Sequence, residues 1–280
     1  MRIELGKSNR LRVVKRVDFG MYLDGDEDGE ILLPSRYVPA GCKPGDELDV
    51  LIYLDNEERL VATTERPLVY VGEFAFLRVS WVNAYGAFLY WGPMKDLFVP
   101  FREQPTPMRQ GESYVVHVHV DAESFRIAAS ARVEHYLSHA MPPYREGDPV
   151  EVLVYRRTPL GYLSIVDNLY SGLIYANEVF GSLDVGTRTR AYVRRVRTDA
   201  KLDLSIQRTG RGGVDDFAQV LLDYLHAHGG RVALGDKSPA EDIYATFGVS
   251  KKTFKRAVGE LYRQRLISIT DTEIRVTDVP

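Results

Sequence analysis

The fold of this chain is decided by the stretch AFLRVSWVNAYGAFLYW, residues 75–91. It contains two runs rich in Val, Phe, Leu and Trp, and Gly86 follows an aromatic residue between them. Runs of this kind, bounded by turn residues, predict short β-strands. KDLFVP (95–100), RQGESYVVHVHVD (109–121) and FRIAAS (125–130) predict three more. Five short strands in about 65 residues are too few for a sandwich but can close into a small barrel without exposed edges.

The same order of strands and turns occurs three times. The first copy starts with LRVVKRVDFGMYLD (11–24) and the third with DPVEVLVYRRTPLGYLSIVD (148–167). The marker glycines Gly20, Gly86 and Gly161 lie 66 and 75 residues apart, so each copy is a small domain rather than a solenoid repeat.

Beyond Gly213 the hydrophobic period becomes helical. Residues 214–230, 238–249 and 251–266 predict three helices, and residues 267–278 predict a hairpin. This order is that of a winged helix-turn-helix.

The N-caps and buried faces of these helices also follow from the sequence. We expect Ser238, followed by Pro239, to cap the second helix, and Ser250 to cap the third. The residues expected to be buried are Phe217, Val220, Leu221, Leu225, Phe254, Val258, Leu261 and Tyr262.

The second unit resembles S1-type RNA-binding OB-fold domains. The resemblance lies at Tyr85-Gly-Ala-Phe88, Asp96-Leu-Phe-Val-Pro100, Gly111 and Arg126-Ile-Ala-Ala-Ser130, and the other two units match more loosely. Three such units before a winged helix resemble the bacterial conserved virulence factor B family, which implies an RNA-binding regulator without a catalytic centre. The predicted fold class is mainly β with a C-terminal α+β module: three tandem S1-type OB-fold barrels plus a winged helix-turn-helix. The predicted domains are residues 1–66, 67–134, 148–211 and 212–280, with a linker at 135–147.

In S1-type domains, two aromatic residues of the second strand and a His-type position on the third form a platform for bases. The resemblance assigns Phe19 and Tyr22 to this platform in the first unit, and Tyr85 and Phe88 in the second. The third unit has Leu160 and Leu163, with Tyr175 at the His-type position, where Pro34 and Pro100 stand in the first two. Residues three apart on a strand face opposite sides, so we expect a bulge at Gly20 or Gly86 to restore a common face.

Positive charge gathers in the third unit. Residues 145–213 carry 11 Lys and Arg against 8 Asp and Glu, although the whole chain has a net charge of −3. By alternation, Arg188, Arg190 and Arg194 flank Tyr192 on one face of a strand, and Arg195 and Arg197 share the other face with Val193. Arg156, Arg157, Tyr162 and Tyr175 complete a predicted groove for a nucleic-acid backbone. The alternative is a barrel strand kept soluble by its charge.

A second cationic face is predicted on the third helix, where Lys251, Lys252, Lys255 and Arg256 lie together. It can extend an RNA surface, enter the major groove of DNA, or keep a packed helix soluble. In contrast, the acidic turn DGDEDGE (24–30) of the first unit should repel phosphate unless it is only a solvated loop.

Several other classes are disfavoured. The single cysteine, Cys42, excludes an internal disulfide and predicts a reducing, cytoplasmic setting. No apolar stretch is long enough for a membrane span, and no phosphate loop or nucleophile turn is present. His117 and His119 are predicted to be a barrel surface pair rather than metal ligands.

The sequence therefore predicts a cytoplasmic, non-enzymatic protein that needs no cofactor or metal, does not bind membranes, and acts on single-stranded RNA in post-transcriptional regulation. The alternatives are a transcriptional regulator on duplex DNA and a protein-interaction scaffold. The predicted RNA-contacting residues are Phe19, Tyr22, Tyr85, Phe88, Arg156, Arg157, Tyr162, Tyr175, Arg188, Arg190, Arg194, Arg195, Lys251, Lys252, Lys255 and Arg256.

Overall fold

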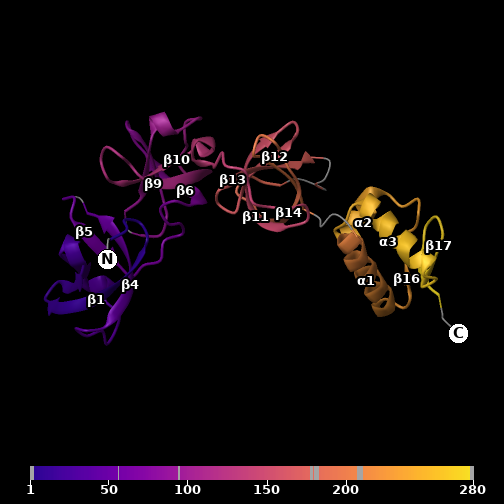
Figure 1. Cartoon of the computed structure of the whole chain (residues 1–280), viewed down its shortest axis with the longest axis horizontal. Helices are drawn as coiled ribbons and strands as arrows, with labels where there is room; N and C mark the ends of the chain where they lie inside the picture. Colours follow the sequence, from indigo (N-terminus) through magenta and orange to yellow (C-terminus); the bar gives the residue numbers. More distant parts are fainter. Residues whose placement is uncertain are drawn as a thin grey trace. The chain divides into compact units, whose positions relative to one another are not determined.

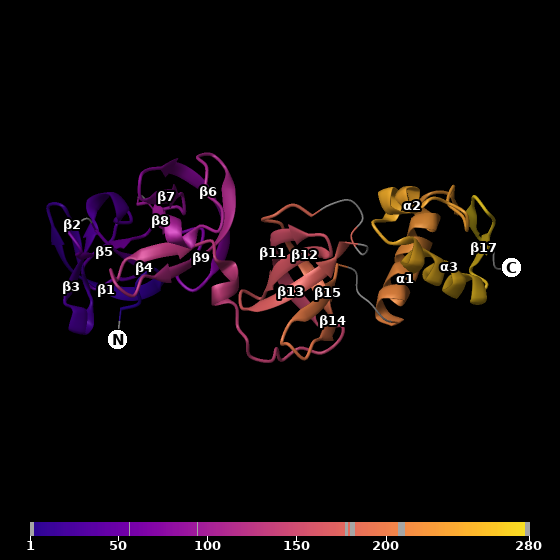
Figure 2. The same ribbon diagram turned by 90° about the horizontal axis from the view of Figure 1, so that it is seen from above.

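The structure is a computed structural model, and it describes residues 3–55, 57–93, 95–176, 179, 183–206 and 211–277. Along the chain it forms three closed five-stranded barrels and a C-terminal helical domain with a small sheet (Figures 1 and 2). Two compact units divide the chain, Met1–Leu137 and Ser138–Pro280. Among the described residues, no helix has the length and apolar character that crossing a membrane requires.

The three barrels share one topology, in which the third strand pairs in parallel with the fifth and the remaining pairs are antiparallel. Barrel 1 contains β1 (Ser8–Val17), β2 (Gly20–Asp24), β3 (Glu30–Pro34), β4 (Glu47–Leu54) and β5 (Leu60–Thr63). Barrel 2 contains β6 (Phe74–Val82), β7 (Gly86–Leu89), β8 (Leu97–Pro100), β9 (Ser113–Val120) and β10 (Ile127–Ser130). Barrel 3 contains β11 (Pro149–Thr158), β12 (Gly161–Val166), β13 (Tyr170–Tyr175), β14 (Arg188–Val196) and β15 (Leu202–Ser205). The predicted fold class is confirmed.

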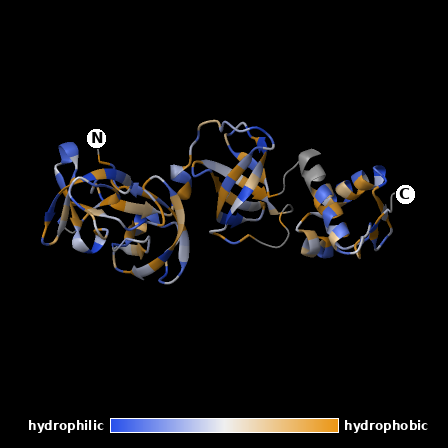
Figure 3. Ribbon diagram, turned by 90° about the horizontal axis from the view of Figure 1, so that it is seen from below, coloured by the Kyte–Doolittle hydropathy of each residue, from blue (hydrophilic) through white to orange (hydrophobic). Residues whose placement is uncertain are grey.

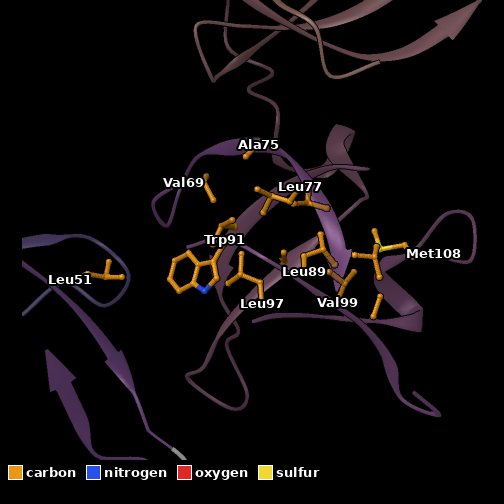
Figure 4. Packing of buried hydrophobic residues seen from close by; sticks show 14 residues of the cluster. Leu51, Val69, Ala75, Leu77, Leu89, Trp91, Leu97, Val99 and Met108 are labelled. Carbon is orange, nitrogen blue, oxygen red and sulfur yellow. The ribbon is translucent and has the colours of Figure 1, made fainter. Parts of the chain in front are cut away.

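Along the strands of each barrel, every second side chain is largely buried in the core. Hydrophobic and hydrophilic stretches accordingly alternate along the ribbon in Figure 3. The core of barrel 2 includes Leu77, Leu89, Leu97 and Trp91, and it is joined by Leu51 from β4 of barrel 1 (Figure 4). Barrels 1 and 2 therefore share buried contacts.

The marker glycines allow two strands to approach closely. A Cβ atom at Gly20, Gly86 or Gly161 would lie 2.1 to 2.2 Å from a backbone oxygen of the third strand of the same barrel. The bulge predicted at these glycines is wrong: the register shifts lie in the first strands, between Val13 and Lys15 in barrel 1 and between Val79 and Trp81 in barrel 2. The glycine serves packing, and the bulge re-aims residues of the neighbouring strand.

The C-terminal domain consists of α1 (Arg211–Ala227), β16 (Arg231–Val232), α2 (Ala240–Phe247), α3 (Lys251–Arg263), β17 (Ile267–Ile269) and β18 (Ile274–Val276). The predicted hairpin is present, but β16 adds a third strand beside β18 that the sequence pattern did not indicate.

Ser250 caps α3 as predicted, since its hydroxyl accepts a hydrogen bond from the Thr253 backbone at 3.1 Å. Ser238 does not cap α2. Its hydroxyl accepts a hydrogen bond from the Gly235 backbone at 2.8 Å, and Pro239 occupies the cap position. Val220 and Tyr262, predicted to be buried, are exposed because only one side of each helix packs on the core.

Candidate nucleic-acid interface

Three aromatic rings form a ladder across barrel 2. Phe88 on β7 lies opposite Trp81 of β6 and Phe98 of β8 in the strand register. The rings of Trp81 and Phe88 are parallel to within 2°, with centroids 3.7 Å apart, and the centroids of Phe88 and Phe98 are 5.0 Å apart. The bulge before Trp81 brings this ring onto the face of the ladder. Trp81 is 43% exposed and Tyr85, in the turn before β7, is 75% exposed.

The ladder lies in a groove of about 900 Å³, mostly apolar, that also receives β4 residues of barrel 1. The residues that line the groove include Tyr53, Leu54, Trp81, Asn83, Tyr85, Phe88, Lys95, Asp96, Phe98, Arg102, Asp121, Ser124 and Arg126. Stacked rings beside cationic side chains are the chemistry that holds an unpaired base and its phosphate. The prediction placed Tyr85 and Phe88 in such a site, and both line it.

The cations at the groove are held by defined partners. Arg126 forms an ion pair with Glu58 of barrel 1 at 2.8 Å, and Arg102 lies 3.4 Å from Asp121. Lys95 donates to the backbone oxygen of Leu54 at 3.3 Å, and burial, assisted by the positive charge of Arg126, lowers the pKa of Lys95. These side chains are oriented before any ligand arrives, which limits the entropy lost on binding.

Asp121 is the acidic counterpart of these cations. Its carboxylate accepts hydrogen bonds from the backbone and the hydroxyl of Ser124, each at 2.8 Å. The backbone bond from Ser124, followed by the hydroxyl bond, lowers the pKa of Asp121. Asp121 is therefore a fixed negative charge that orients Arg102 and the hairpin between β9 and β10.

The strand register places different chemistry on the same face of the other barrels. The positions of Trp81, Tyr85, Phe88 and Phe98 in barrel 2 are occupied by Lys15, Phe19, Tyr22 and Leu32 in barrel 1, and by Arg156, Leu160, Leu163 and Leu173 in barrel 3. Only barrel 2 has four aromatic residues there. The sequence analysis missed Trp81 and Phe98. The feature that could have identified them is their position opposite Phe88 on the neighbouring strands.

In barrel 1 the two predicted residues lie together. The rings of Phe19 and Tyr22 meet edge to face with centroids 6.3 Å apart, and Phe19 is exposed. Lys15 lies 5.0 Å from the centre of the Tyr22 ring, and its ammonium group is 2.6 Å from Glu30. The cation over this ring is thus already paired with a carboxylate of the acidic turn.

In barrel 3 the structure corrects the role of Tyr162. This ring is 2% exposed and packs in the barrel core, so it cannot stack on a base. Tyr175 is half-buried and accepts a hydrogen bond from Arg197 at 2.8 Å while donating to Asp203 at 3.1 Å. Arg157 lies exposed at the end of β11, 5.9 Å from the centre of the Tyr162 ring.

The arginines of β14 depart from simple alternation. Val193 is buried, and a register shift between Val193 and Arg195 leaves Arg194 and Arg195 both exposed. The predicted shared face of Arg195, Arg197 and Val193 is therefore wrong. Arg188 and Arg190 are exposed, as is Arg156 on β11, and Arg190 forms an exposed ion pair with Glu151 at 3.3 Å.

In the winged helix, the four predicted cations lie on the first two turns of α3. Lys251 donates to the Ser238 backbone oxygen at 2.8 Å, and Lys255 forms an ion pair with Asp236 at 2.9 Å. Lys252 and Arg256 are exposed. Half of this cationic face therefore contributes to packing the loop before α2 against α3.

The predicted surface pair of histidines is also wrong. His117 is buried between Phe74 and Tyr136, with ring centroids at 4.7 and 4.0 Å, because the 3-10 turn Val133–Tyr136 covers this side of β9. Burial, together with the neighbouring His119, lowers the pKa of His117 to about 4. Among the residues that the structure describes, no group of three or more potential metal-ligating side chains is present.

Comparison with known proteins agrees with this architecture. Residues 5–65 match the S1 domain family, and residues 219–276 match the CvfB-like winged helix domain family. Conserved virulence factor B of Staphylococcus aureus (strain N315) is 25% identical over 240 residues, covering 83% of this chain and 80% of that protein. The chain is therefore similar to conserved virulence factor B over most of its length.

Two other known proteins are similar to the chain over most of its length. YitL of Bacillus subtilis (strain 168) is 28% identical over 267 residues, covering 92% of this chain and 89% of YitL. A solved structure of a multidomain protein with nucleic acid binding domains from Streptococcus pneumoniae TIGR4 is 24% identical, with a TM-score of 0.43 and 98% coverage of both chains. S1 and winged helix domains are typically non-enzymatic nucleic-acid-binding modules, which supports a nucleic-acid-binding protein.

Proposed function

We propose that this protein is a cytoplasmic, non-catalytic regulator of gene expression that binds single-stranded RNA. The observation that carries the proposal is the ring ladder of Trp81, Phe88 and Phe98 in the groove of barrel 2, with Tyr85 exposed at its edge. Rings in a groove can stack only on bases that are free of a duplex, since paired bases already stack on their neighbours.

Barrel 3 and the winged helix provide separate cationic surfaces on the same chain. The exposed arginines of β14 and β11 lie on a barrel whose equivalent ring positions are leucines, so this barrel is suited to phosphate contacts rather than stacking. Several weak sites in one chain reinforce one another through a high effective concentration. The buried free thiol of Cys42 is compatible with a reducing compartment.

A duplex DNA-binding regulator is the second candidate, and it is favoured by one observation. Lys252 and Arg256 are exposed near the N-terminus of α3, which is the helix that winged helix-turn-helix proteins place in the major groove. In this case the groove of barrel 2 would have no part in binding.

A competition experiment separates the two candidates. The full chain is bound to a labelled oligouridylate and challenged with unlabelled oligouridylate or duplex DNA of equal phosphate number, at low and at physiological salt. We expect the single strand to compete better at both salt concentrations. Retention of the protein by the duplex alone would overturn the proposal.

The two tryptophans of the chain provide an internal readout. Both border the groove, but Trp91 is buried and its indole nitrogen donates to the Lys95 backbone oxygen at 2.6 Å, whereas Trp81 is 43% exposed and available to a base. A base that stacks in the groove should quench the fluorescence of Trp81, and this quenching should disappear in Trp81→Phe.

A further inference from the structure

Asp96 is an acidic side chain in the groove of barrel 2. Among the described residues, none forms a hydrogen bond or an ion pair with its carboxylate. The neighbouring acceptor oxygens are already engaged: the side-chain oxygen of Asn83 accepts hydrogen bonds from the backbone of Tyr85 and Gly86, at 2.8 and 3.2 Å, and Asp121 accepts from Ser124. Asp96 therefore offers two acceptor oxygens to a ligand.

Asp96 lies beside the ring ladder. It immediately precedes β8 and is two residues before Phe98, and both residues line the groove. Residues two apart on an extended chain project to the same side and are separated by roughly 6 to 7 Å along it. A base stacked on Phe88 and Phe98 would therefore direct one of its edges toward the Asp96 carboxylate.

Asp96 is not needed to neutralise the arginines of the groove, because they already have acidic partners. Arg126 is paired with Glu58 at 2.8 Å, and Arg102 lies 3.4 Å from Asp121. An additional negative charge at this place weakens phosphate binding in general. Its contribution to binding must come from a directional contact with a hydrogen-bond donor.

We propose that Asp96 makes the groove of barrel 2 selective for guanine, an inference that rests on the proposed binding of single-stranded RNA. The Watson–Crick edge of guanine presents two parallel donors, N1–H and the N2 amino group, which match the two oxygens of a carboxylate. Adenine and cytosine present one amino donor on this edge. In uracil the N3–H donor lies between two carbonyl oxygens, which repel a carboxylate. A bidentate contact of this type discriminates strongly between bases.

The test uses the full chain and a set of oligouridylates in which one central base is replaced by guanine, inosine, adenine or cytosine. For the wild-type chain we expect guanine to bind roughly tenfold more tightly than uracil, the order of discrimination of a bidentate base contact. Inosine lacks the N2 amino group and should lose roughly half of this gain on a logarithmic scale. Asp96→Asn and Asp96→Ser should bind all five oligonucleotides with similar affinity.

Glu123→Gln is the matched control. Glu123 is exposed next to the groove residue Ser124, and its carboxylate lies 4.0 Å from Arg102. The substitution therefore removes one negative charge beside the groove but leaves Asp96 and the ring ladder in place. It should retain the preference for guanine.

The outcomes distinguish the inference from the function on which it rests. Equal binding of guanine and uracil by the wild-type chain overturns the role of Asp96 while RNA binding stands. If Asp96→Asn binds every oligonucleotide more tightly by the same factor, the wild-type carboxylate acts only by repelling phosphate. This result also overturns the role of Asp96. Failure of all oligonucleotides to bind overturns both proposals. If the Asp96 variants do not fold, a wild-type chain that does not separate guanine from inosine and uracil still contradicts the inference.

Discussion

Truncation of Trp81 to alanine is the most direct test of the ring ladder. Phe88 covers one face of the indole at 3.7 Å, and the ring remains 43% exposed in the groove. Stacking of one base is worth about 1–3 kcal/mol, so Trp81→Ala should raise the Kd for single-stranded RNA by about 5- to 150-fold. Because the indole is uncharged, the dependence of log Kd on log salt concentration should not change.

The assay is fluorescence anisotropy of a labelled oligoribonucleotide, measured over a series of salt concentrations. Phe76→Ala is the matched control, since Phe76 lies on the same strand with 41% exposure but does not line the groove. Its Kd should stay within about twofold of the wild-type value. Thermal unfolding of both variants shows whether barrel 2 is intact. A folded Trp81→Ala chain with wild-type affinity, or equal losses in the two variants, would refute the reasoning.

Further predictions concern charge, packing and pH. The double charge reversal of Arg190 and Arg194 to Glu should weaken RNA binding for all sequences. It should also reduce the slope of log Kd against log salt concentration, measured by anisotropy, by about 0.7 for each lost phosphate contact. Gly86→Ala should destabilise its barrel by at least about 1–3 kcal/mol in denaturant unfolding, because the new Cβ would lie 2.2 Å from a backbone oxygen. Gly259→Ala, on an open face of α3, should instead stabilise its domain by about 0.5–1 kcal/mol. The pKa of His117, about 4 in the fold against an ordinary 6.5, means that the unfolded chain binds more protons below pH 6.5. Stability should thus be constant above that pH and fall by about 2 kcal/mol between pH 7 and pH 5, a loss that His117→Leu should abolish in urea titrations at both pH values.

Much of the fold could be read from local patterns. The strands, their order and the three barrels follow from alternation and from the glycines after Phe19, Tyr85 and Leu160. The helices of the last domain follow from a period of 3.6 and from the Ser250 cap. These features depend on neighbouring residues only, so a linear pattern contains them.

The candidate site was predicted only in part. Tyr85 and Phe88 were found because they are close to the marker glycine, whereas Trp81, Phe98 and Asp96 join them through strand register. Tyr162 was placed in the interface because its aromatic type suits stacking, but a bulge in the preceding strand sets it opposite Arg157, and it packs in the core.

The sequence by itself determined the repeated barrel, the winged helix and the distribution of charge, because periodicity and composition are properties of contiguous segments. Only the tertiary structure decided which rings form a ladder, which arginines face solvent and which groove carboxylate is left without a partner among the described residues. A single bulge shifts the register by one residue and reverses the side on which every later side chain lies, and the energy that fixes this register comes from contacts between distant strands.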